Sequence, residues 1–359
     1  MDINKVPRDW EVESFDQSFA RITKNAQSAK TNKYMDYGLI PVIDQGKHQI
    51  AGFIDDERKR YKCPKSGLIV FGDHTRVVKF VNHDFVLGAD GTQLLEARDG
   101  FNAKFLYYLL SAKEIPNTGY NRHFKFLKEL TFVKPSKSEQ RAIAEVLSDI
   151  DELIYKSKLL IDKKQRILDA QCEEVFNPSK LANFENYKSQ KLGTLSDITT
   201  GRRDVNEGTV NGRYPFFTCS TKHFWSDNFS FDTEAILIAG NGDVGNLHYY
   251  NGKFEAYQRT YVCTNFQSNS RYIWFFLKYA LAENLGLNKI GSTIPYIVLS
   301  QLTEFEVLIP EDESEIELIV NTLEVATREI ELLSNELAKY EWLKQGMMND
   351  LLMGKVRLV

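Results

Sequence analysis

The sequence lacks the marks of a metalloprotein, a disulfide-rich domain or a membrane protein. Its four cysteines, Cys63, Cys172, Cys219 and Cys263, lie far apart and form no C-x-x-C pair, so we expect reduced thiols rather than a zinc site or a disulfide framework. The six histidines are scattered. No apolar run approaches the length needed to cross a bilayer, and the first residues show no charged-then-apolar leader. We expect a soluble, cytoplasmic protein without a metal site.

Catalytic signatures are equally scarce. The Asn/Asp-Pro-Pro-aromatic sequence of amino-methyltransferases does not occur, and Glu57-Arg58-Lys59 after Asp44 lacks the strand context of a metal-dependent nuclease. Residues 240–245 satisfy G-x-G-x-x-G. The following residues 246–252 alternate and end in Asn-Gly, which indicates a strand and a turn rather than a phosphate-binding helix. We therefore predict no catalytic residue and no cofactor in this chain, and a self-sufficient nuclease or methyltransferase finds no support.

Two long segments carry the apolar spacing that coiled-coil helices need. In the second, residues spaced alternately three and four apart are Ile316, Ile319, Leu323, Ala326, Ile330, Leu333, Leu337, Tyr340, Lys344, Met347 and Leu351, and Lys344 interrupts the apolar row. In the first, the same spacing gives Ile143, Val146, Ile150, Leu153, Ser157, Leu160, Lys164 and Ile167, with an adjoining row of Leu147, Ile154, Ile161, Leu168 and Val175. Each segment, at roughly 35 residues, would span about 50 Å.

The presence of both segments in one chain favours an antiparallel intramolecular pair over a homodimeric coiled coil, which is the alternative. The adjoining row of the first segment leaves apolar surface for another protein. We therefore predict that Leu147, Ile154, Ile161, Leu168 and Val175 bind a partner.

Negative charge is concentrated in these helical segments. Residues 310–359 hold 5 Lys and Arg against 11 Asp and Glu, and residues 135–186 hold 8 against 10. The remaining parts carry 21 against 17 in residues 1–134, and 11 against 11 in residues 187–309. The globular parts are therefore free to face a polyanion, although the overall formal charge is −4.

The order of segments repeats after roughly 170 residues. Trp10 with Phe15 recurs as Tyr187 with Leu192, and residues 40–43 recur as residues 214–217. In the first copy the pattern predicts strands at residues 39–43, 50–54, 67–71 and 76–81, a helix at 102–112 and a last strand before Pro135. Aromatic residues at helical spacing in both copies (Phe105, Tyr107, Tyr108; Tyr272, Trp274, Phe275, Phe276) are interpreted as core rather than as a stacking surface for bases.

The predicted fold is α+β: two similar β-rich globular domains separated by two long helices that pack as an antiparallel intramolecular coiled coil. The predicted boundaries are 1–134 for the first domain, 135–180 for the central helix, 181–309 for the second domain and 310–359 for the last helix and a tail packing back toward the first domain. The final residues 354–358 are expected to lie beside the first domain, where they could add a strand.

The chain resembles the specificity (DNA-recognition) subunits of type I restriction-modification systems. The resemblance rests on VPRDWEV at the start, KPSKSEQRAIAEVLSDID opening the central helix, GSTIPYIVLSQL near the end of the second domain and LLMGKVRL at the terminus. Pro135, Glu139, Gln140, Arg141 and Ile143 carry the most specific pattern. The second copy departs from it, because Glu315 stands where Gln140 stood.

The resemblance implies a chain that chooses a DNA site and catalyses nothing. Each domain would be a target-recognition domain for half of a bipartite site in double-stranded DNA, and the helices would set the spacer. Two copies of an adenine-N6 methyltransferase subunit, which bring the AdoMet, and ATP-dependent restriction subunits are the implied partners. The alternative is a coiled-coil scaffold or protein-binding adaptor without DNA specificity.

Loop residues with the right chemistry are our candidates for DNA contact, because Arg can read guanine, Asn can read adenine and Lys mostly holds phosphate. They are Arg58, Lys59, Arg60, Arg76, Arg122 and His123 in the first domain, and Arg202, Arg203, Arg213, Lys222, Asn241, Gly242, Arg259, Ser292 and Thr293 in the second. Gly242 qualifies because a glycine loop lets backbone N–H groups approach a phosphate.

Overall fold

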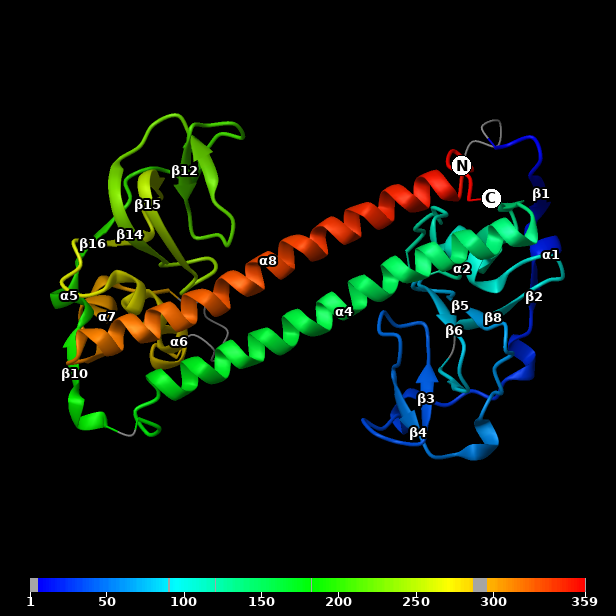
Figure 1. Ribbon diagram of the computed structural model, residues 1–359, viewed down its shortest axis with the longest axis horizontal. Helices are drawn as coiled ribbons and strands as arrows, with labels where there is room; N and C mark the ends of the chain where they lie inside the picture. The colour runs from blue at the N-terminus through cyan, green and yellow to red at the C-terminus, as the bar shows by residue number, and fades with distance from the viewer. Residues whose placement is uncertain (1–5, 90, 120, 182, 287–295, 359) are drawn as a thin grey trace. The chain divides into compact units, whose positions relative to one another are not determined.

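The computed structural model describes residues 6–89, 91–119, 121–181, 183–286 and 296–358, and it divides into two compact units. Unit 1 contains Met1–Lys158 and Asn335–Val359, and unit 2 contains Leu159–Ser334. The long helices α4 (Lys137–Phe176) and α8 (Glu313–Leu351) each contribute residues to both units (Figure 1). None of the helices within these described ranges is long and apolar enough to cross a bilayer.

The described residues of unit 1 form a β domain with nine strands. Its elements are β1 (Glu11–Ser14), α1 (Phe15–Ser18), β2 (Phe19–Arg21), η2 (Thr23–Asn25), η3 (Thr31–Lys33), β3 (Ile40–Ile43), β4 (Gly52–Ile54), η4 (Glu57–Lys59), β5 (Leu68–Gly72), β6 (Val78–Val81), β7 (Val86–Leu87), β8 (Thr92–Ala97), α2 (Ala103–Ser111), α3 (Phe124–Leu127) and β9 (Thr131–Lys134). The strands form sheets in the order β2-β8-β5-β6, β4-β3-β7 and β1-β9. The predicted strands and helix of the first copy are all present, whereas β7 and β8 were not predicted.

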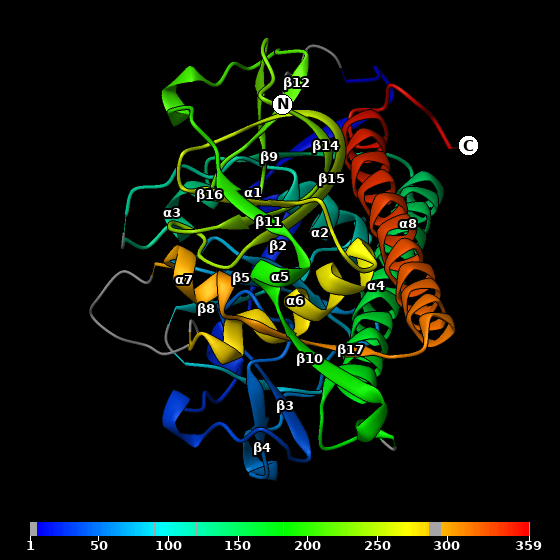
Figure 2. The ribbon, with the colours of Figure 1, turned by 90° about the vertical axis from the view of Figure 1, so that its left-hand side faces the viewer.

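Unit 2 contains a second β domain. Its elements are η5 (Phe184–Asn186), β10 (Tyr187–Lys191), α5 (Leu192–Leu195), β11 (Asp197–Thr200), η6 (Val205–Glu207), β12 (Tyr214–Phe217), β13 (Phe224–Ser226), β14 (Phe231–Ala239), β15 (Leu247–Ala256), β16 (Thr260–Thr264), α6 (Ser270–Asn284), α7 (Leu299–Thr303) and β17 (Glu306–Pro310). The sheet order is β11-β16-β14-β15-β12-β13, with β10-β17 apart, and β16, β14 and β15 lie side by side in both ribbon views (Figures 1 and 2).

The two β domains share one topology. In unit 1 β3 pairs antiparallel with β4 and parallel with β7; in unit 2 β12 pairs antiparallel with β13 and parallel with β15. The orders β2-β8-β5-β6 and β11-β16-β14-β15 also correspond. The long strand β15 takes the places of both β6 and β7. The six-stranded sheet of unit 2 therefore corresponds to the four-stranded and three-stranded sheets of unit 1 together. The predicted duplication is therefore a duplication of strand order and register.

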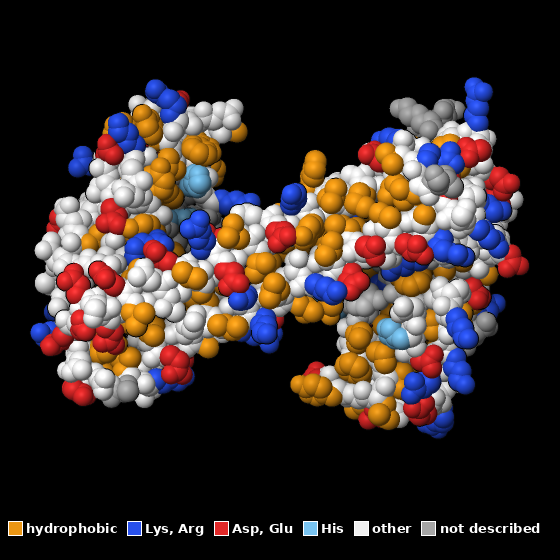
Figure 3. All heavy atoms as spheres, in the orientation of Figure 1, with side chains coloured by type: hydrophobic (Ala, Val, Ile, Leu, Met, Phe, Trp, Pro, Cys, Tyr) orange, Lys and Arg blue, Asp and Glu red, His pale blue; other side chains and the backbone are white. Residues whose placement is uncertain are grey.

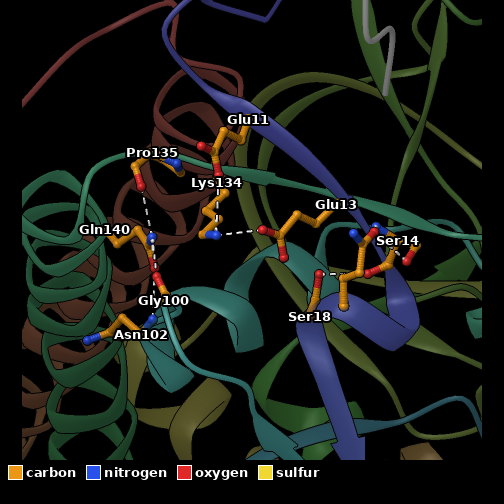
Figure 4. Close-up of polar contacts among 10 residues, drawn as sticks. Glu11, Glu13, Ser14, Ser18, Gly100, Asn102, Lys134, Pro135 and Gln140 are labelled. Atoms are coloured by element: carbon orange, nitrogen blue, oxygen red, sulfur yellow. Dashed lines mark hydrogen bonds and ion pairs between the residues drawn. The ribbon is translucent and has the colours of Figure 1, made fainter.

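Helices α2 and α6 supply the apolar layer of each domain. Each follows an asparagine cap: Asn102 accepts from the Phe105 N–H, and Asn269 accepts from the N–H groups of Arg271 and Tyr272. Phe105 and Tyr272 are fully buried, as the core interpretation of the aromatic clusters predicted. In unit 1 the buried Gln140 side chain accepts from the Asn102 N–H at 2.7 Å and donates to the carbonyl oxygens of Gly100 and Pro135 (Figure 4), which fixes the start of α4 against α2.

Within each unit the two long helices run antiparallel. In unit 1 Lys344 meets Asp151 at 2.6 Å and Lys158 meets Glu341 at 2.7 Å; in unit 2 Lys164 meets Glu329 at 2.8 Å. The predicted row of α8 is buried or half-buried along its length, from Ile316 to Leu351. Lys344, which interrupts that row, is accommodated by its ion pair with Asp151. The α+β class with two β-rich domains and two long helices is confirmed.

The C-terminal residues do not form the expected strand. After Gly354, whose φ is 66°, the Arg357 guanidinium donates to the Glu139 carboxylate at 2.5 Å and to Asp9 at 2.8 Å. Glu139 is 1% exposed and also accepts from the Trp10 indole N–H at 3.1 Å. The tail is therefore held in unit 1 by the ion pairs of the Arg357 side chain rather than by strand pairing.

Candidate nucleic-acid interface

Three loops of unit 2 meet at one end of its sheet. They are residues 218–223 between β12 and β13, residues 240–246 between β14 and β15, and residues 257–259 between β15 and β16; we call them loop cluster 2. The Asp243 N–H donates to the Cys219 carbonyl at 3.1 Å, and the Gly240 N–H donates to the Arg259 carbonyl at 3.0 Å. Asn246 Nδ2 donates to the Ser220 carbonyl at 3.3 Å. These bonds tie the three loops into one surface.

The glycine motif lies inside loop cluster 2 and leads into strand β15, as its sequence context predicted. Gly242 has a φ of 65°, and a Cβ atom on Gly240 would lie 2.7 Å from the Arg259 carbonyl oxygen. Glycine at these two positions permits a left-handed turn and a close approach of two loops. The loop connects two antiparallel strands, so its geometry is that of a hairpin connection rather than of a strand-to-helix phosphate loop.

The equivalent loops of unit 1 also meet. Residues 44–51 between β3 and β4, residues 73–77 between β5 and β6, and residues 88, 89 and 91 between β7 and β8 form loop cluster 1. The Gln45 side chain accepts from the His74 N–H at 3.1 Å, while the Thr75 hydroxyl donates to the Gln45 carbonyl at 2.6 Å. The Asp73 N–H donates to the Gly91 carbonyl at 2.6 Å. Each unit therefore presents the same trio of loops.

Most candidates of unit 2 fall on or beside loop cluster 2. Lys222, Asn241, Gly242 and Arg259 belong to its loops, and the Gln258 N–H donates to the Arg203 carbonyl at 3.0 Å, which places the segment 202–203 beside them. Arg213 precedes β12, whereas the cluster loop follows that strand. The remaining candidates, Ser292 and Thr293, lie outside the described residues.

Arg202 and Arg203 differ in their surroundings. Arg202 is exposed. Arg203 forms ion pairs with Glu207 at 2.7 Å and with Glu255 at 3.6 Å, and the Glu255 side chain is 1% exposed. The Ser230 hydroxyl donates to the same buried carboxylate at 2.8 Å. Arg203 thus offsets a buried negative charge, in addition to any role in binding.

The candidates of unit 1 are more dispersed. Arg58, Lys59 and Arg60 lie at η4, and Arg58 and Arg60 form ion pairs with Asp56 at 2.8 Å and Glu57 at 2.5 Å. These hydrogen bonds raise the pKa of both arginines and partly neutralise the local positive charge. The surface is therefore a mixed one rather than a purely cationic patch.

Three further candidates of unit 1 come after β5. Arg76 lies in loop cluster 1 with a φ of 63°, and its guanidinium donates to the Ile115 carbonyl at 3.1 Å. Arg122 is exposed. The adjacent His123 is fully buried, and both its backbone N–H and its Nδ1 approach the Asp73 carbonyl, at 2.8 and 2.9 Å. The prediction that His123 contacts DNA is therefore wrong: this side chain holds the β5–β6 turn from inside the domain.

Sequence reasoning missed the exposed polar residues of loop cluster 1. Lys47, His48 and Gln49 are exposed in the β3–β4 loop, which corresponds to the β12–β13 loop that contains Lys222 in unit 2. The sequence match between residues 40–43 and 214–217 could have identified them. Because Lys222 lies in the loop that follows residues 214–217, the equivalent loop after residues 40–43, at residues 44–50, could have been predicted to contact DNA as well.

The predicted partner-binding row of α4 faces inward for part of its length. Leu147 is fully buried in the core of unit 1 and Leu168 is 6% exposed in the core of unit 2, so neither can bind a partner; Ile154, Ile161 and Val175 are half-buried. Leu153, Leu160 and Ile167, which the spacing assigned to the helix pair, are 45%, 40% and 43% exposed. Ser157 and Lys164 of the same row are half-buried, so over this stretch the two rows share the inner face of the helix.

Helix α8 presents a second exposed row that the sequence reading did not single out. Leu318, Val325 and Leu332 follow one another at seven-residue spacing in unit 2 and are 67%, 70% and 61% exposed. A groove of about 490 Å³ beside it is lined by Ile167 and Lys164 of α4 and by Val325 and Glu329 of α8. Large apolar side chains at this exposure on a helix face mark a docking surface more often than a stability feature.

The chain thus combines a duplicated β domain, with the same loop trio in each copy, and two long helices. The family model described as the type I restriction modification DNA specificity domain matches residues 7–162 and again residues 184–341. The chain belongs to this family, and the resemblance seen in its sequence is confirmed.

Individual relatives agree with the assignment. The chain is 36% identical over 146 residues to the type I restriction enzyme EcoDI specificity subunit of Escherichia coli, a match covering 41% of this chain and 32% of that protein. It is 21% identical over 373 aligned residues to the MjaIX specificity subunit of Methanocaldococcus jannaschii, covering 86% and 85%. The fold is also that of the type I S subunit structure from M. genitalium, with a TM-score of 0.73 at 18% identity, covering 98% and 97% of the two chains.

Proposed function

We propose that this chain is the sequence-reading subunit of a type I restriction-modification complex. It directs an adenine-N6 methyltransferase, and a restriction subunit where one is present, to a bipartite site in double-stranded DNA. Each β domain reads one half-site through its loop cluster. The observation that carries the proposal is the duplication of one domain topology, with the same loops converging in each copy, in a chain whose family is defined by DNA specificity. In this role the chain is not an enzyme, and AdoMet belongs to the partner.

The loop clusters have the chemistry that DNA recognition needs. Loop cluster 2 combines Lys222 and Arg259, which suit phosphate and guanine, with Asn241, which suits adenine. Loop cluster 1 offers Lys47, His48 and Arg76. Contacts to phosphate would give affinity and register, and contacts to base edges would give specificity.

The exposed row of α8, Leu318, Val325 and Leu332, supports docking of a methyltransferase subunit. Its seven-residue spacing fits a helix of the partner packed alongside. Leu160 and Ile167 of α4 add apolar surface in the same unit. We propose this surface in place of the row that contains Leu147 and Leu168, and we keep two methyltransferase copies as the expected stoichiometry.

A genome-wide map of N6-methyladenine tests the proposal. Cells that express the methyltransferase should methylate a bipartite motif when this chain is present and lose that motif when its gene is deleted. Purified complex should bind duplexes carrying the motif with an affinity that falls as salt rises. An identical methylation map with and without the gene would favour the coiled-coil scaffold instead.

A further inference from the structure

The edge of each β domain is a two-stranded ribbon with a common framework. Ribbon 1 comprises residues 35–54 with strands β3 and β4, and ribbon 2 comprises residues 209–226 with strands β12 and β13. Pro41 faces Phe53 in ribbon 1, and Pro215 faces Trp225 in ribbon 2. An additional bridge joins Met35 to Phe53 and, equivalently, Thr209 to Trp225. These pairings align the strands of the two ribbons, and ribbon 1 is longer than ribbon 2 in the loop between its strands.

The framework residues keep their character between the ribbons. Gly38 corresponds to Gly212, and at both positions a Cβ atom would clash with the facing strand. Pro41 corresponds to Pro215, and the aromatic Phe53 corresponds to the aromatic Trp225. The backbone of the ribbon is thus held in the same way in both units.

The exposed positions change chemical class. Tyr37 corresponds to Asn211, Leu39 to Arg213 and Ile50 to Lys222 in the alignment that the strand pairs set. Tyr37 is 87% exposed, Leu39 71% and Ile50 40%, while the Arg213 side chain is 73% exposed. Large apolar side chains so exposed contribute little to folding. The two ribbons thus share a backbone structure but differ in their exposed side chains. This difference indicates that both ribbons bind in the same manner and that each binds a different ligand.

The ribbons adjoin the loop clusters. Ile50 lies at the end of the loop that begins with Asp44, and Lys222 lies in the corresponding loop of unit 2. In Figure 3 hydrophobic side chains gather over the parts of the molecule where Figure 1 places β3 and β4, and also where it places β12. Ribbon and loops therefore form one continuous surface in each unit.

We propose that ribbon 1 and ribbon 2 are the specificity-determining elements of the two half-sites, an inference that rests on the proposed function. A two-stranded ribbon fits the DNA major groove, where Arg reads guanine and apolar groups contact the thymine methyl. Ribbon 1 reads its half through Tyr37, Leu39 and Ile50, and ribbon 2 reads its half through Arg213 and Lys222. A protein that docked on both ribbons in the same way would require the same side chains at equivalent positions, and these positions differ.

Binding measured on a panel of duplexes tests this assignment. The full chain in complex with its methyltransferase is titrated with a duplex of the mapped methylated sequence and with duplexes in which each base pair is replaced in turn. The Tyr37→Ala and Leu39→Ala double variant should lose about 5- to 150-fold discrimination at positions of one half only. The Arg213→Ala and Lys222→Ala double variant should lose it in the other half only. Tyr155→Ala, a 62% exposed tyrosine on α4, is the matched control.

The outcomes separate the two proposals. Discrimination that is unchanged at every position, or lost equally in both halves, overturns the ribbon assignment. Loss of the methyltransferase from the complex while the remaining complex still discriminates also overturns it, because the apolar surface would then be a protein interface. If the unaltered complex fails to discriminate between duplexes, it is the proposed function that fails. The altered side chains are exposed, so circular dichroism should show unchanged folding.

Discussion

At the residue scale, Arg202 is a clean test of phosphate binding at loop cluster 2. Because Arg202 is exposed, replacing it by Ala should weaken binding without destabilising the fold. The slope of log affinity against log salt should become shallower by about 0.9, the value for one lost phosphate contact. Lys188→Ala is the control. It removes a cation on β10 that is paired with Glu311, and it should leave the slope unchanged.

Arg203 should behave differently from its neighbour. Its removal leaves the buried Glu255 with the Ser230 hydroxyl but without a cation. Because Arg203 is 42% exposed and solvent screens its pair with Glu255, we expect Arg203→Ala to lower the stability of the fold only modestly, by less than the loss of a fully buried pair would. Chemical denaturation of Arg203→Ala measures this, and a stability equal to that of Arg202→Ala would contradict the structural role.

The Arg357 contacts predict a pH dependence in acid. Hydrogen bonds from Arg357 lower the pKa of Asp9 below its ordinary value of 3.8. Ionised Asp9 therefore stabilises the fold in full above pH 3.8, and its contribution disappears as the pH falls through the lowered pKa. Asp9→Asn should melt at a lower temperature than the unaltered protein at pH 7, and the difference should vanish in strong acid. A difference that is constant with pH would count against this ion pair.

Residue chemistry alone could not separate binding side chains from structural ones. His123 and Arg122 look equally suited to DNA in the sequence, yet one is buried against Asp73 and the other is exposed. The distinction depends on the β5–β6 turn, a contact across 50 residues that no local pattern encodes. The helix row of α8, in contrast, was predictable because its burial follows from its own periodicity.

At the element scale, α4 shows where periodicity becomes ambiguous. Two apolar rows run side by side on this helix, and each repeats every seven residues. The row that includes Ser157 and Lys164 is the more polar one, and the structure exposes its Leu153, Leu160 and Ile167. Ser157 and Lys164 of that row are half-buried, as are Ile154 and Ile161 of the other row, and Lys164 pairs with Glu329. The buried face of α4 therefore draws residues from both rows, so the spacing of either row alone did not identify it.

Strand β8 was missed for a related reason. It is an inner strand between β2 and β5, and its first four residues are buried without alternation, so both of its faces are covered over that length. The polar Thr92 and Gln93 occupy buried positions in this strand, so its sequence shows neither the alternation nor the apolar run by which strands are recognised. Strands β3 to β6, bounded by turn residues, gave clearer patterns.

The exposed row of α8 predicts where the methyltransferase docks. Replacing Leu318, Val325 and Leu332 by Asp should abolish co-purification, because three charges would have to be buried in an apolar helix interface. All three side chains point into solvent, so the free chain should fold normally. Ser334→Asp adds one charge at an exposed position of the same helix outside the lining of the groove and should retain the complex. Co-purification of the triple variant would rule out this surface.

At the scale of the whole molecule, the helices are predicted to set the spacer of the site. A seven-residue insertion after Lys158 together with one after Ser334 lengthens both helices by about 10 Å and keeps their faces nearly in register. The non-specific spacer should grow by up to about three base pairs while both half-sites persist. An insertion in one helix alone breaks the pairing and serves as the control. A spacer of unchanged length in the methylated motif would reject this role.

The duplication of the β domain was predictable because the order of segments repeats in the amino-acid sequence. The matches of Trp10 with Tyr187 and of residues 40–43 with 214–217 are reproduced in the strand registers. The loop clusters were not predictable in the same way, because they depend on which loops meet at the end of a sheet. The compact units also divide α4 and α8 between them, whereas the predicted boundaries follow the ends of the helices, so these boundaries stay a prediction.

The central claim is that two equivalent domains each read one half of a bipartite DNA site. The most direct test maps N6-methyladenine across the genome of cells carrying either the unaltered chain or a variant with Arg202, Lys222 and Arg259 replaced by Ala. We predict a two-part motif for the unaltered chain, and a motif relaxed or lost in one part alone for the variant. A single contiguous motif, or a change spread equally over both parts, would contradict the account.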